Sequence, residues 1–298
     1  MLKICSLLFT CAISSLLFTG CVKEDKLKEL IVKDIDCGVH LSEASGLAYI
    51  EKEKKLYIVG DKGKLYTCGA ELTQDTITLK YEKELYIQHN FGSIDIEGLD
   101  VMPDGQLIVS IEGSSSGIYK MSKDGVIKEA YSLPKVLKTA NFTSNRTLET
   151  VVHHPDYGIL TASEFPINNQ TLSAQTIYSL DGKNKWNFDM ENWDLNGITS
   201  LEVDTDGNLL VLERSQPKSG FLRTSIVKVD IKNCANKTKC DKKVLFDADT
   251  AFSNFEGMTN IKEKNFLRVN DNQGIKDIKT EFKYFQIEEI VIDPSKLK

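Results

Sequence analysis

Apolar and polar residues alternate along the chain in short runs that glycine, proline and aspartate separate. Residues 98–102 alternate in this way, and the Pro-Asp-Gly that follows at 103–105 predicts a tight turn. Further strands are predicted at residues 106–112, 117–121 and 126–133. A period of two residues is typical of strands with one buried face. Four such strands with tight turns predict a small antiparallel sheet.

The same unit recurs along the chain at an interval of about 50 residues. Each recurrence is marked by small or acidic residues before an apolar residue, and successive marks are 52, 52, 50 and 57 residues apart. Propeller blades repeat on about this spacing, so we predict an all-β chain forming a single β-propeller of four-stranded antiparallel blades, with five blades favoured. The marks begin at Ser45, Glu97, Glu149, Thr199 and Glu256.

The last unit ends after three strands, at about residues 284–292. A lone strand-like run at residues 30–36 precedes the first unit, and we expect it to complete the last blade. Closing the ring in this way removes exposed strand edges. Six blades remain open if the connection at 134–148 contains a degenerate blade. The alternative architecture is a plain β-sandwich, although a sandwich does not require a 50-residue period.

The N-terminus has the pattern of an export signal. Lys3 is the only charged residue among the first twenty, and residues 4–18 are almost wholly apolar but too few to span a bilayer. Phe18-Thr19-Gly20-Cys21 resembles the lipobox of bacterial lipoproteins, which implies a lipid on Cys21, although Leu is commoner at the position of Phe18. The alternative is an ordinary secretory signal with an incidental cysteine.

These features predict three segments: a signal peptide at 1–20, a lipidated cysteine and tether at 21–29, and the propeller domain at 30–298. We expect the protein to be exported and anchored by Cys21 at the outer membrane or outer cell surface of a bacterium. No later stretch is long and apolar enough to span a bilayer, so membrane contact is expected through the lipid alone.

The charge of the chain limits its partners. It carries 37 basic and 43 acidic side chains and a formal net charge of −6. A mildly acidic protein is a poor candidate for binding nucleic acid through its overall field, and we expect a monomer without a nucleic-acid partner.

Four cysteines remain in the predicted domain, at 37, 68, 234 and 240. An even number in an oxidising compartment predicts two disulfides. Cys234 and Cys240 lie six residues apart and close an easy loop, and Cys37 with Cys68 follows by elimination. A zinc site made by the four is the alternative, although their spacing is not that of the usual paired knuckles.

The register of the repeat brings the acidic residues together. Each unit carries a second marked residue about fifteen positions after the first. The first opens the innermost strand and the second ends the strand that returns antiparallel to it, so both lie on one face of the disc. Eight of the ten positions are acidic, which predicts a ring of carboxylates at one mouth of the channel. The pairs are Ser45 with Asp61, Glu97 with Glu112, Glu149 with Glu164, Thr199 with Glu213, and Glu256 with Asp271.

Carboxylates this close repel one another unless a cation compensates them. Ca²⁺ takes about six to eight oxygen ligands and is the cation we predict here. The alternative is that the acids accept hydrogen bonds from backbone amides of the neighbouring blade and lock the ring. Arg146 and Arg214 lie on loops of the same face and could bind a phosphate or carboxylate. The predicted metal ligands are Asp61, Glu97, Glu112, Glu164, Glu256 and Asp271.

Taken together, these motifs resemble the phytase-like propeller family, whose name records an esterase-like activity of phytase. The resemblance covers residues 36–286 and rests on the order and spacing of short motifs. It implies a propeller and suggests calcium-assisted hydrolysis of an ester or phosphoester. The third unit departs from the pattern, with Asn145-Arg146-Thr147-Leu148 where a glycine is expected nearer the glutamate. The motifs are Glu43 to Leu47, Asp95 to Leu99, Asn145 to Glu149, Asp206 to Arg214, Asn254 to Gly257, and Asp271-Asn272.

Two functions remain open. The first is a metal-assisted hydrolase of a small-molecule ester or phosphoester, in which Glu149, Glu213, Arg146 and Arg214 form the catalytic set. The second is a non-catalytic propeller with structural calcium that holds a ligand or protein at the cell surface. An acidic mouth with few lysines would repel heavily anionic phytate, so a smaller ester or a binding role is favoured over phytate hydrolysis.

Overall fold

A computed structural model describes the chain over residues 22–142, 147–168, 170–171, 173–191, 195–215, 221–237, 239–251, 253–275 and 278–292. The predicted signal peptide, Cys21 and Arg146 lie outside the described residues. Within those residues, no helix is long and apolar enough to cross a membrane.

The described residues form three four-stranded antiparallel sheets and one sheet of eight strands. In each four-stranded sheet the strands follow chain order, as tight turns between successive short strands dictate. One sheet comprises β6 (Ile96–Val101), β7 (Leu107–Ile111), β8 (Gly117–Met121) and β9 (Ile127–Ala130). The next comprises β10 (Leu148–His154), β11 (Gly158–Ser163), β12 (Ala174–Ser179) and β13 (Lys185–Asp189). The third comprises β14 (Asn196–Val203), β15 (Leu209–Ser215), β16 (Leu222–Val229) and β17 (Lys242–Ala251).

The eight-stranded sheet joins the two ends of the chain. Its order is β18-β19-β20-β1-β5-β4-β3-β2. The early strands are β1 (Val22–Asp34), β2 (Ala44–Ile50), β3 (Lys55–Gly60), β4 (Lys64–Leu72) and β5 (Thr76–Tyr86). The late strands are β18 (Asn254–Lys262), β19 (Asn265–Asp271) and β20 (Phe282–Ile292). Short helices occur at α1 (Cys37–His40), η1 (Glu51–Glu53), η2 (Gly113–Ser115) and α2 (Lys135–Lys138).

Strand β1 connects the two halves of this sheet. Val22 to Leu30 pair antiparallel with β20, and Ile31 to Asp34 pair parallel with β5. An N-terminal strand therefore completes the C-terminal unit, as predicted. It begins earlier than the predicted run at 30–36, and most of its pairing with β20 uses residues expected to form a tether. Charged residues dominate residues 22–30, so the sequence shows no alternation typical of a strand there. A half-exposed strand tolerates such residues because pairing needs only the backbone.

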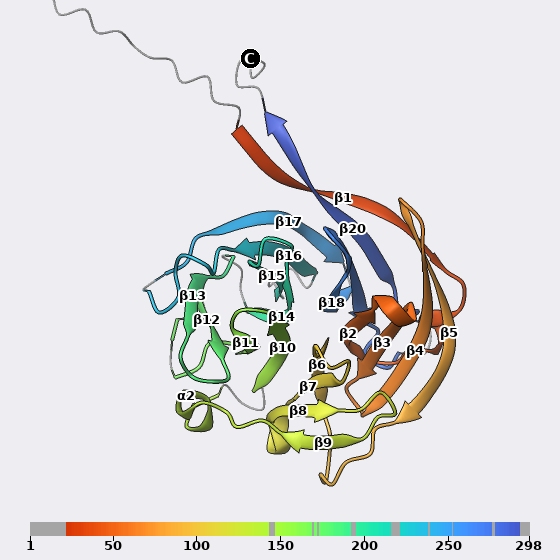
Figure 1. The fold of residues 1–298 in the computed structure, drawn as a ribbon, viewed down its shortest axis with the longest axis horizontal. Helices are drawn as coiled ribbons and strands as arrows, with labels where there is room; N and C mark the ends of the chain where they lie inside the picture. The colour runs from red at the N-terminus through yellow and green to blue at the C-terminus, as the bar shows by residue number, and fades with distance from the viewer. Residues whose placement is uncertain are drawn as a thin grey trace, which may run out of the picture.

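The innermost strands form a ring. Strands β2, β6, β10, β14 and β18 contact one another in this cyclic order, and β18 returns to β2. Figure 1 shows them around the centre of the disc, with the β1–β20 ribbon projecting from its rim. This cyclic order is that of a β-propeller and differs from the two packed layers of a sandwich. The number of blades stays a prediction, because eight of the strands are continuous in one sheet.

Glycine allows these inner strands to approach closely. A Cβ at Gly98 would lie 2.8 Å from the backbone nitrogen of Val151, and one at Gly257 would lie 2.9 Å from the carbonyl oxygen of Ser45. Contacts under 3.0 Å are not tolerated by real Cβ atoms. The glycine that follows the acidic position in two of the motifs is therefore required by packing around the channel.

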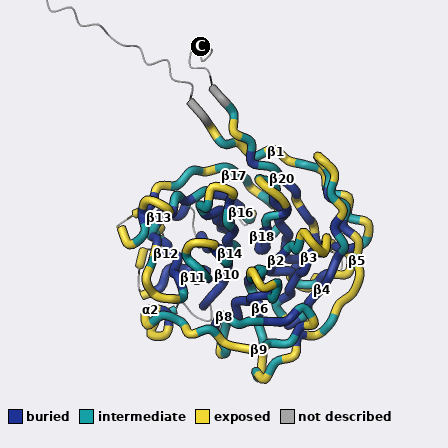
Figure 2. The backbone as a smooth tube through the Cα atoms, viewed as in Figure 1, coloured by how far each residue is buried: buried dark blue, intermediate teal, exposed yellow. Residues whose placement is uncertain are grey.

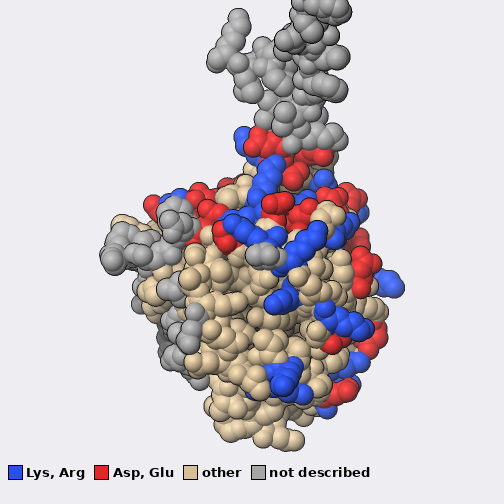
Figure 3. Space-filling model, turned by 90° about the vertical axis from the view of Figure 1, so that its left-hand side faces the viewer, with Lys and Arg blue, Asp and Glu red and all other residues tan. Residues whose placement is uncertain are grey.

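Apolar side chains fill the spaces between adjacent sheets, and buried backbone is concentrated around the inner strands (Figure 2). The two predicted disulfides, Cys37–Cys68 and Cys234–Cys240, are confirmed, which removes the zinc alternative. On the face shown in Figure 3, acidic and basic side chains are interspersed near the end from which the ribbon projects, and the lower part is largely uncharged.

Candidate metal and active site

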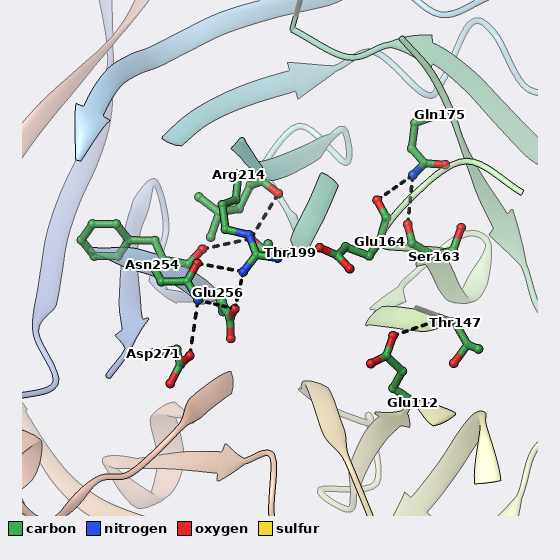
Figure 4. Close-up of polar contacts among 12 residues, drawn as sticks. Glu112, Thr147, Ser163, Glu164, Gln175, Thr199, Arg214, Asn254, Glu256 and Asp271 are labelled. Atoms are coloured by element: carbon green, nitrogen blue, oxygen red, sulfur yellow. Dashed lines mark hydrogen bonds and ion pairs between the residues drawn. The ribbon is translucent and has the colours of Figure 1, made fainter. Parts of the chain in front are cut away.

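Carboxylates converge at one end of the channel, and the strand register explains why. Glu97, Glu149 and Glu256 lie at the start of the inner strands β6, β10 and β18. Asp61 and Glu164 directly follow the neighbouring strands β3 and β11, which run antiparallel to inner strands. Strand starts and antiparallel strand ends meet at the same edge of a sheet, so these side chains share one mouth. Figure 4 shows Glu164 and Glu256 of this set on either side of Arg214.

The acids form three overlapping groups. In each group the carboxylates offer oxygen atoms that all lie within 4.8 Å of one another. Because Glu97 and Glu112 each belong to two groups, the carboxylates form a continuous arc across the mouth. The groups are Asp61, Glu97 and Glu256; Asp95, Glu97 and Glu112; and Glu112, Glu149 and Glu164.

Arg214 links the two ends of this arc. Its Nη2 donates to Oε1 of Glu164 at 2.6 Å, and its Nη1 donates to Oε1 of Glu256 at 2.8 Å. The Nη1 atom also donates to Oδ1 of Asn254 at 2.8 Å. Burial disfavours the charge on Arg214, but Glu256, Glu164 and Glu149 attract it and raise the pKa of Arg214 above its ordinary value. The guanidinium is therefore a fixed cation, with 21% of its side chain exposed.

Four acids of the arc, Asp61, Glu97, Glu149 and Glu256, have raised pKa values. Burial, followed by the charges of Glu256 and Asp271, raises the pKa of Asp61 to about 9. Burial also raises the pKa of Glu256 to about 7, against the opposing attraction of Arg214. Burial and neighbouring acids raise the pKa values of Glu97 and Glu149 well above the ordinary value. Among the described residues, Arg214 alone is too little positive charge for this arc, so near neutral pH the mouth must hold protons or bind cations.

Asn254 and Asp271 flank the arc at β18 and β19. The amide nitrogen Nδ2 of Asn254 donates to Oε1 of Glu256 at 2.6 Å and to Oδ2 of Asp271 at 3.3 Å. The backbone nitrogen of Gln273 donates to Oδ1 of Asp271 at 2.6 Å. Asp271 thus lies beside the arc, as predicted, but one of its oxygens is already held by its own loop.

Glu213 lies elsewhere, although the sequence predicted it in the catalytic set. It is fully buried, and its Oε2 accepts from the backbone nitrogen of Glu191 at 3.0 Å, from Nδ2 of Asn196 at 3.0 Å and from Oγ of Ser225 at 3.2 Å. Glu213 belongs to none of the three carboxylate groups among the described residues. Its contacts are those of a lock that holds the connection before β14.

The register of β15 explains this difference. Ile198 pairs with Glu213, and successive side chains on a strand point to opposite faces. Arg214 therefore points into the mouth, where the sequence placed Glu213. The spacing of the paired acidic positions could have indicated Arg214. In three of the other units the second residue of the pair lies fifteen positions after the first, and the residue fifteen positions after Thr199 is Arg214.

Glu112 lies where a metal ligand was predicted and also accepts a backbone hydrogen bond from the segment before the neighbouring sheet. Its Oε1 accepts from the backbone nitrogen of Thr147 at 2.8 Å, which links β7 to the approach to β10, and it belongs to two of the carboxylate groups. The other predicted ligands in the arc are Asp61, Glu97, Glu164 and Glu256, and Asp95 joins them.

Acids that lock neighbouring sheets also occur at the far ends of the inner strands, where the sequence analysis did not place them. Oδ2 of Asp100 accepts from the backbone nitrogen of His153 at 2.6 Å. Oε2 of Glu202 accepts from the backbone nitrogen of Asn260 at 2.8 Å. Burial raises the pKa of Asp100 to about 6, and burial with the charge of Asp100 raises the pKa of Glu202 to about 8. Asp100 and Glu202 could have been recognised in the sequence as acidic residues inside otherwise apolar strands.

The fold and the mouth define the class of this protein: an all-β propeller with a carboxylate arc and Arg214 held beside it at the end of its channel. The phytase-like family, described as having the esterase-like activity of phytase, matches residues 39–274, and the chain belongs to this family. A search of the curated proteins gives no match.

Solved structures resemble the chain only distantly. A PQQ-bound aldose sugar dehydrogenase from Streptomyces coelicolor is 10% identical with a TM-score of 0.46, covering 91% of this chain and all of that one. Virginiamycin B lyase from Staphylococcus aureus is 13% identical with a TM-score of 0.38, covering 93% of this chain and 90% of that one. A Bacteroides caccae protein of unknown function is 10% identical with a TM-score of 0.45, covering 83% of this chain and 77% of that one. None of these likenesses bears on the chemistry of the mouth.

Proposed function

We propose that this protein is a calcium-assisted hydrolase of a small ester or phosphoester, with its active site at the carboxylate arc. The observation that supports the proposal is the convergence of seven acids in three overlapping groups, with Arg214 between the two ends. Membership of the phytase-like family agrees with this class of reaction.

The arc fits a hard cation. Its donors are carboxylate oxygens, the ligand type that Ca²⁺ prefers. Asp61 has an oxygen, Oδ1, that is buried without a hydrogen-bond partner among the described residues. A buried polar atom left without a partner is costly, and a cation would satisfy it. The residues that would hold Ca²⁺ are Asp61, Glu97, Glu112, Glu164 and Glu256, with Asp95 and Asp271 beside them.

Bound Ca²⁺ would supply Lewis acidity and lower the pKa of a coordinated water. Glu149 is only 5% exposed, and it lies in the arc with Glu112 and Glu164, where burial and the neighbouring acids raise its pKa. We assign Glu149 the removal of a proton from water. Arg214 would stabilise negative charge on the reacting group, as a preorganised donor does best in a site of low dielectric.

The substrate is expected to be small and at most modestly charged. Even with Arg214 the mouth carries an excess of carboxylates, so a polyanion such as phytate would be repelled unless several cations bound first. A phosphomonoester, a phosphodiester or a carboxylic ester with one anionic group meets this limit.

We propose that the chain is exported, that Cys21 carries the lipid anchor, and that the protein acts as a monomer at the bacterial surface. Counting the eight-stranded sheet as two blades that β1 joins gives five blades, which matches the five inner strands in contact around the ring. Replacing Cys21 with serine should abolish incorporation of labelled palmitate and release the protein from membranes.

The test of function uses purified protein stripped with EDTA. We expect added Ca²⁺ to raise the melting temperature, because a ligand at a hundredfold excess over its Kd stabilises the native state by about 2.7 kcal/mol. We also expect Ca²⁺-dependent turnover of p-nitrophenyl phosphate, bis-p-nitrophenyl phosphate or p-nitrophenyl acetate. Glu149→Gln should abolish that turnover while the Ca²⁺ shift persists.

The outcomes separate the two functions. A Ca²⁺ shift without turnover of any of the three compounds would identify a binding propeller with structural calcium. No shift with Ca²⁺, Mg²⁺ or Zn²⁺ would contradict the metal mechanism.

A further inference from the structure

A cavity of about 520 Å³ lies at the end of the molecule opposite the carboxylate arc. It is bordered by the turns that join β2 to β3, β4 to β5, and β18 to β19. These turns lie at the other ends of the strands that begin or end near Asp61 and Asp271. The cavity therefore lies between segments from both halves of the eight-stranded sheet.

The side chains around this cavity are polar but electrically balanced. Lys54 and Lys262 are matched by Glu51 and Glu263, so the charged residues of the rim cancel. An anionic or cationic ligand gains no net attraction from such a rim. The groups left to recognise a ligand are the half-buried ring of Tyr49 and three amides, Gln74, Asn265 and Gln286, whereas Tyr284 is only 2% exposed.

Asn265 has hydrogen-bonding capacity that the protein does not use. Its Nδ2 donates to Oη of Tyr284 at 3.1 Å. Its Oδ1 is buried and has no partner among the described residues. Since an unpaired buried acceptor is unfavourable, a small rotation of this amide toward a ligand hydroxyl would relieve it. Gln74 and Gln286 lie on two other segments of the wall, so the amides face the cavity from different directions.

We propose that this cavity binds an uncharged polyhydroxyl ligand, a saccharide unit of one or two sugars. A primary amide offers a donor and an acceptor side by side, which matches adjacent hydroxyl groups on a sugar ring. The half-buried ring of Tyr49 adds an apolar face with a polar edge at the wall of the cavity. The cavity volume lies within the range of about 300 to 1,000 Å³ that is usual for small-molecule sites. This site is independent of the hydrolase proposal, because it shares no residue with the arc.

The test is isothermal titration calorimetry of the purified protein with N-acetylglucosamine, maltose and inorganic phosphate, each at millimolar concentrations. Such concentrations avoid the general stabilisation that concentrated sugars give by exclusion from the surface. Gln74→Ala and Gln286→Ala remove amides that are exposed or half-buried, so both variants should fold. Asn184→Ala is the matched control, because Asn184 lines a different cavity of about 420 Å³.

We expect saturable binding of at least one saccharide, weakened roughly tenfold in each glutamine variant, which corresponds to about 1.4 kcal/mol per variant. Binding should be unchanged in Asn184→Ala. The proposal is overturned by any of three results: no saturable heat with either saccharide, binding that both glutamine variants leave intact, or phosphate that competes with the saccharide.

Discussion

The guanidinium nitrogen Nη2 of Arg214 donates to Oε1 of Glu164 at 2.6 Å, joining strand β15 to the end of β11. The same guanidinium reaches Glu256 on β18, so one side chain connects three sheets around the channel. On β15 the side chain of Glu213 points into the blade, and the next residue, Arg214, points into the mouth instead. This exchange supplies the one fixed cation of the arc among the described residues.

Removing this cation should destabilise the fold. Arg214→Gln leaves two largely buried carboxylates without their partner, and breaking a buried ion pair in this way costs about 3–5 kcal/mol. The loss should be larger at pH 8 than at pH 5, because protonation of Glu256 relieves the repulsion. Urea unfolding in EDTA measures it. Arg223→Gln is the control: its pair with Asp247 is more exposed and should contribute less than about 1 kcal/mol. Equal losses in the two variants would contradict the central role of Arg214.

Glu97 and Glu213 should respond in opposite ways to amide replacement. Glu97→Gln removes a carboxyl group that the folded, metal-free protein must keep protonated or hold charged beside other acids, so metal-free protein should gain stability. The Ca²⁺-dependent shift in melting temperature should become smaller, because a ligand is lost. Glu213→Gln should keep the full Ca²⁺ shift and lose about 1–3 kcal/mol, because its hydrogen-bond donors become imperfectly paired. Thermal melts of both variants, with EDTA and then Ca²⁺, make the comparison. Loss of the Ca²⁺-dependent shift in Glu213→Gln would show that Glu213 contributes to the metal site.

Stability of the metal-free protein should fall as pH rises. The folded-state pKa values of Asp61 and Glu256, about 9 and about 7, exceed their ordinary values of 3.8 and 4.5. The folded state therefore binds more protons than the unfolded state between about pH 4 and pH 9, and the free energy of unfolding decreases across that window. Denaturant titrations in EDTA at intervals of one pH unit test the sign.

Excess Ca²⁺ should flatten this pH profile, because metal binding replaces the protons. Asp61→Asn should remove the alkaline part of the decline in EDTA. A stability that rises from pH 5 to pH 8 in EDTA would show that the arc is not protonated as its pKa values require.

The N-terminal strand should be needed for closure. Deleting residues 22–30 removes the antiparallel partner of β20 and exposes the backbone of a long strand. We expect a lower melting temperature and concentration-dependent aggregation, measured by calorimetry and light scattering. Lys26→Ala, which leaves the backbone pairing in place, is the matched control. A truncated chain that melts like the full protein would show that β1 is dispensable.

The Cys37–Cys68 bridge should contribute more than the Cys234–Cys240 bridge. The two bridges span 31 and 6 residues. In the chain-entropy account these loops correspond to about 4 and about 2 kcal/mol of stability. Paired serine replacements, compared by urea unfolding, measure the difference. A larger loss from the short loop would show that local packing outweighs loop entropy here.

The strands, the turns and the repeat that makes a ring of sheets could all be predicted from the local sequence pattern. The sequence also placed the acids at one end of the channel. Period-two alternation and turn residues are local properties, and the 50-residue interval then fixes which strand ends share a face. The disulfide pairing followed from so few cysteines. The same logic located Asp61, Glu97 and Glu256 in the arc.

The three-dimensional fold fixes which of the neighbours Glu213 and Arg214 points into the channel. A shift of one residue turns a strand side chain to the opposite face. The pairing of Gly197 with Arg214 and of Ile198 with Glu213 sets this register, and the fifteen-residue spacing after Thr199 agrees with it. The start of β1 was also decided in three dimensions, because its charged residues become a strand only when β20 offers a backbone partner. Backbone pairing and burial depend on segments that are distant in the sequence, so the local alternation of apolar and polar residues does not predict them.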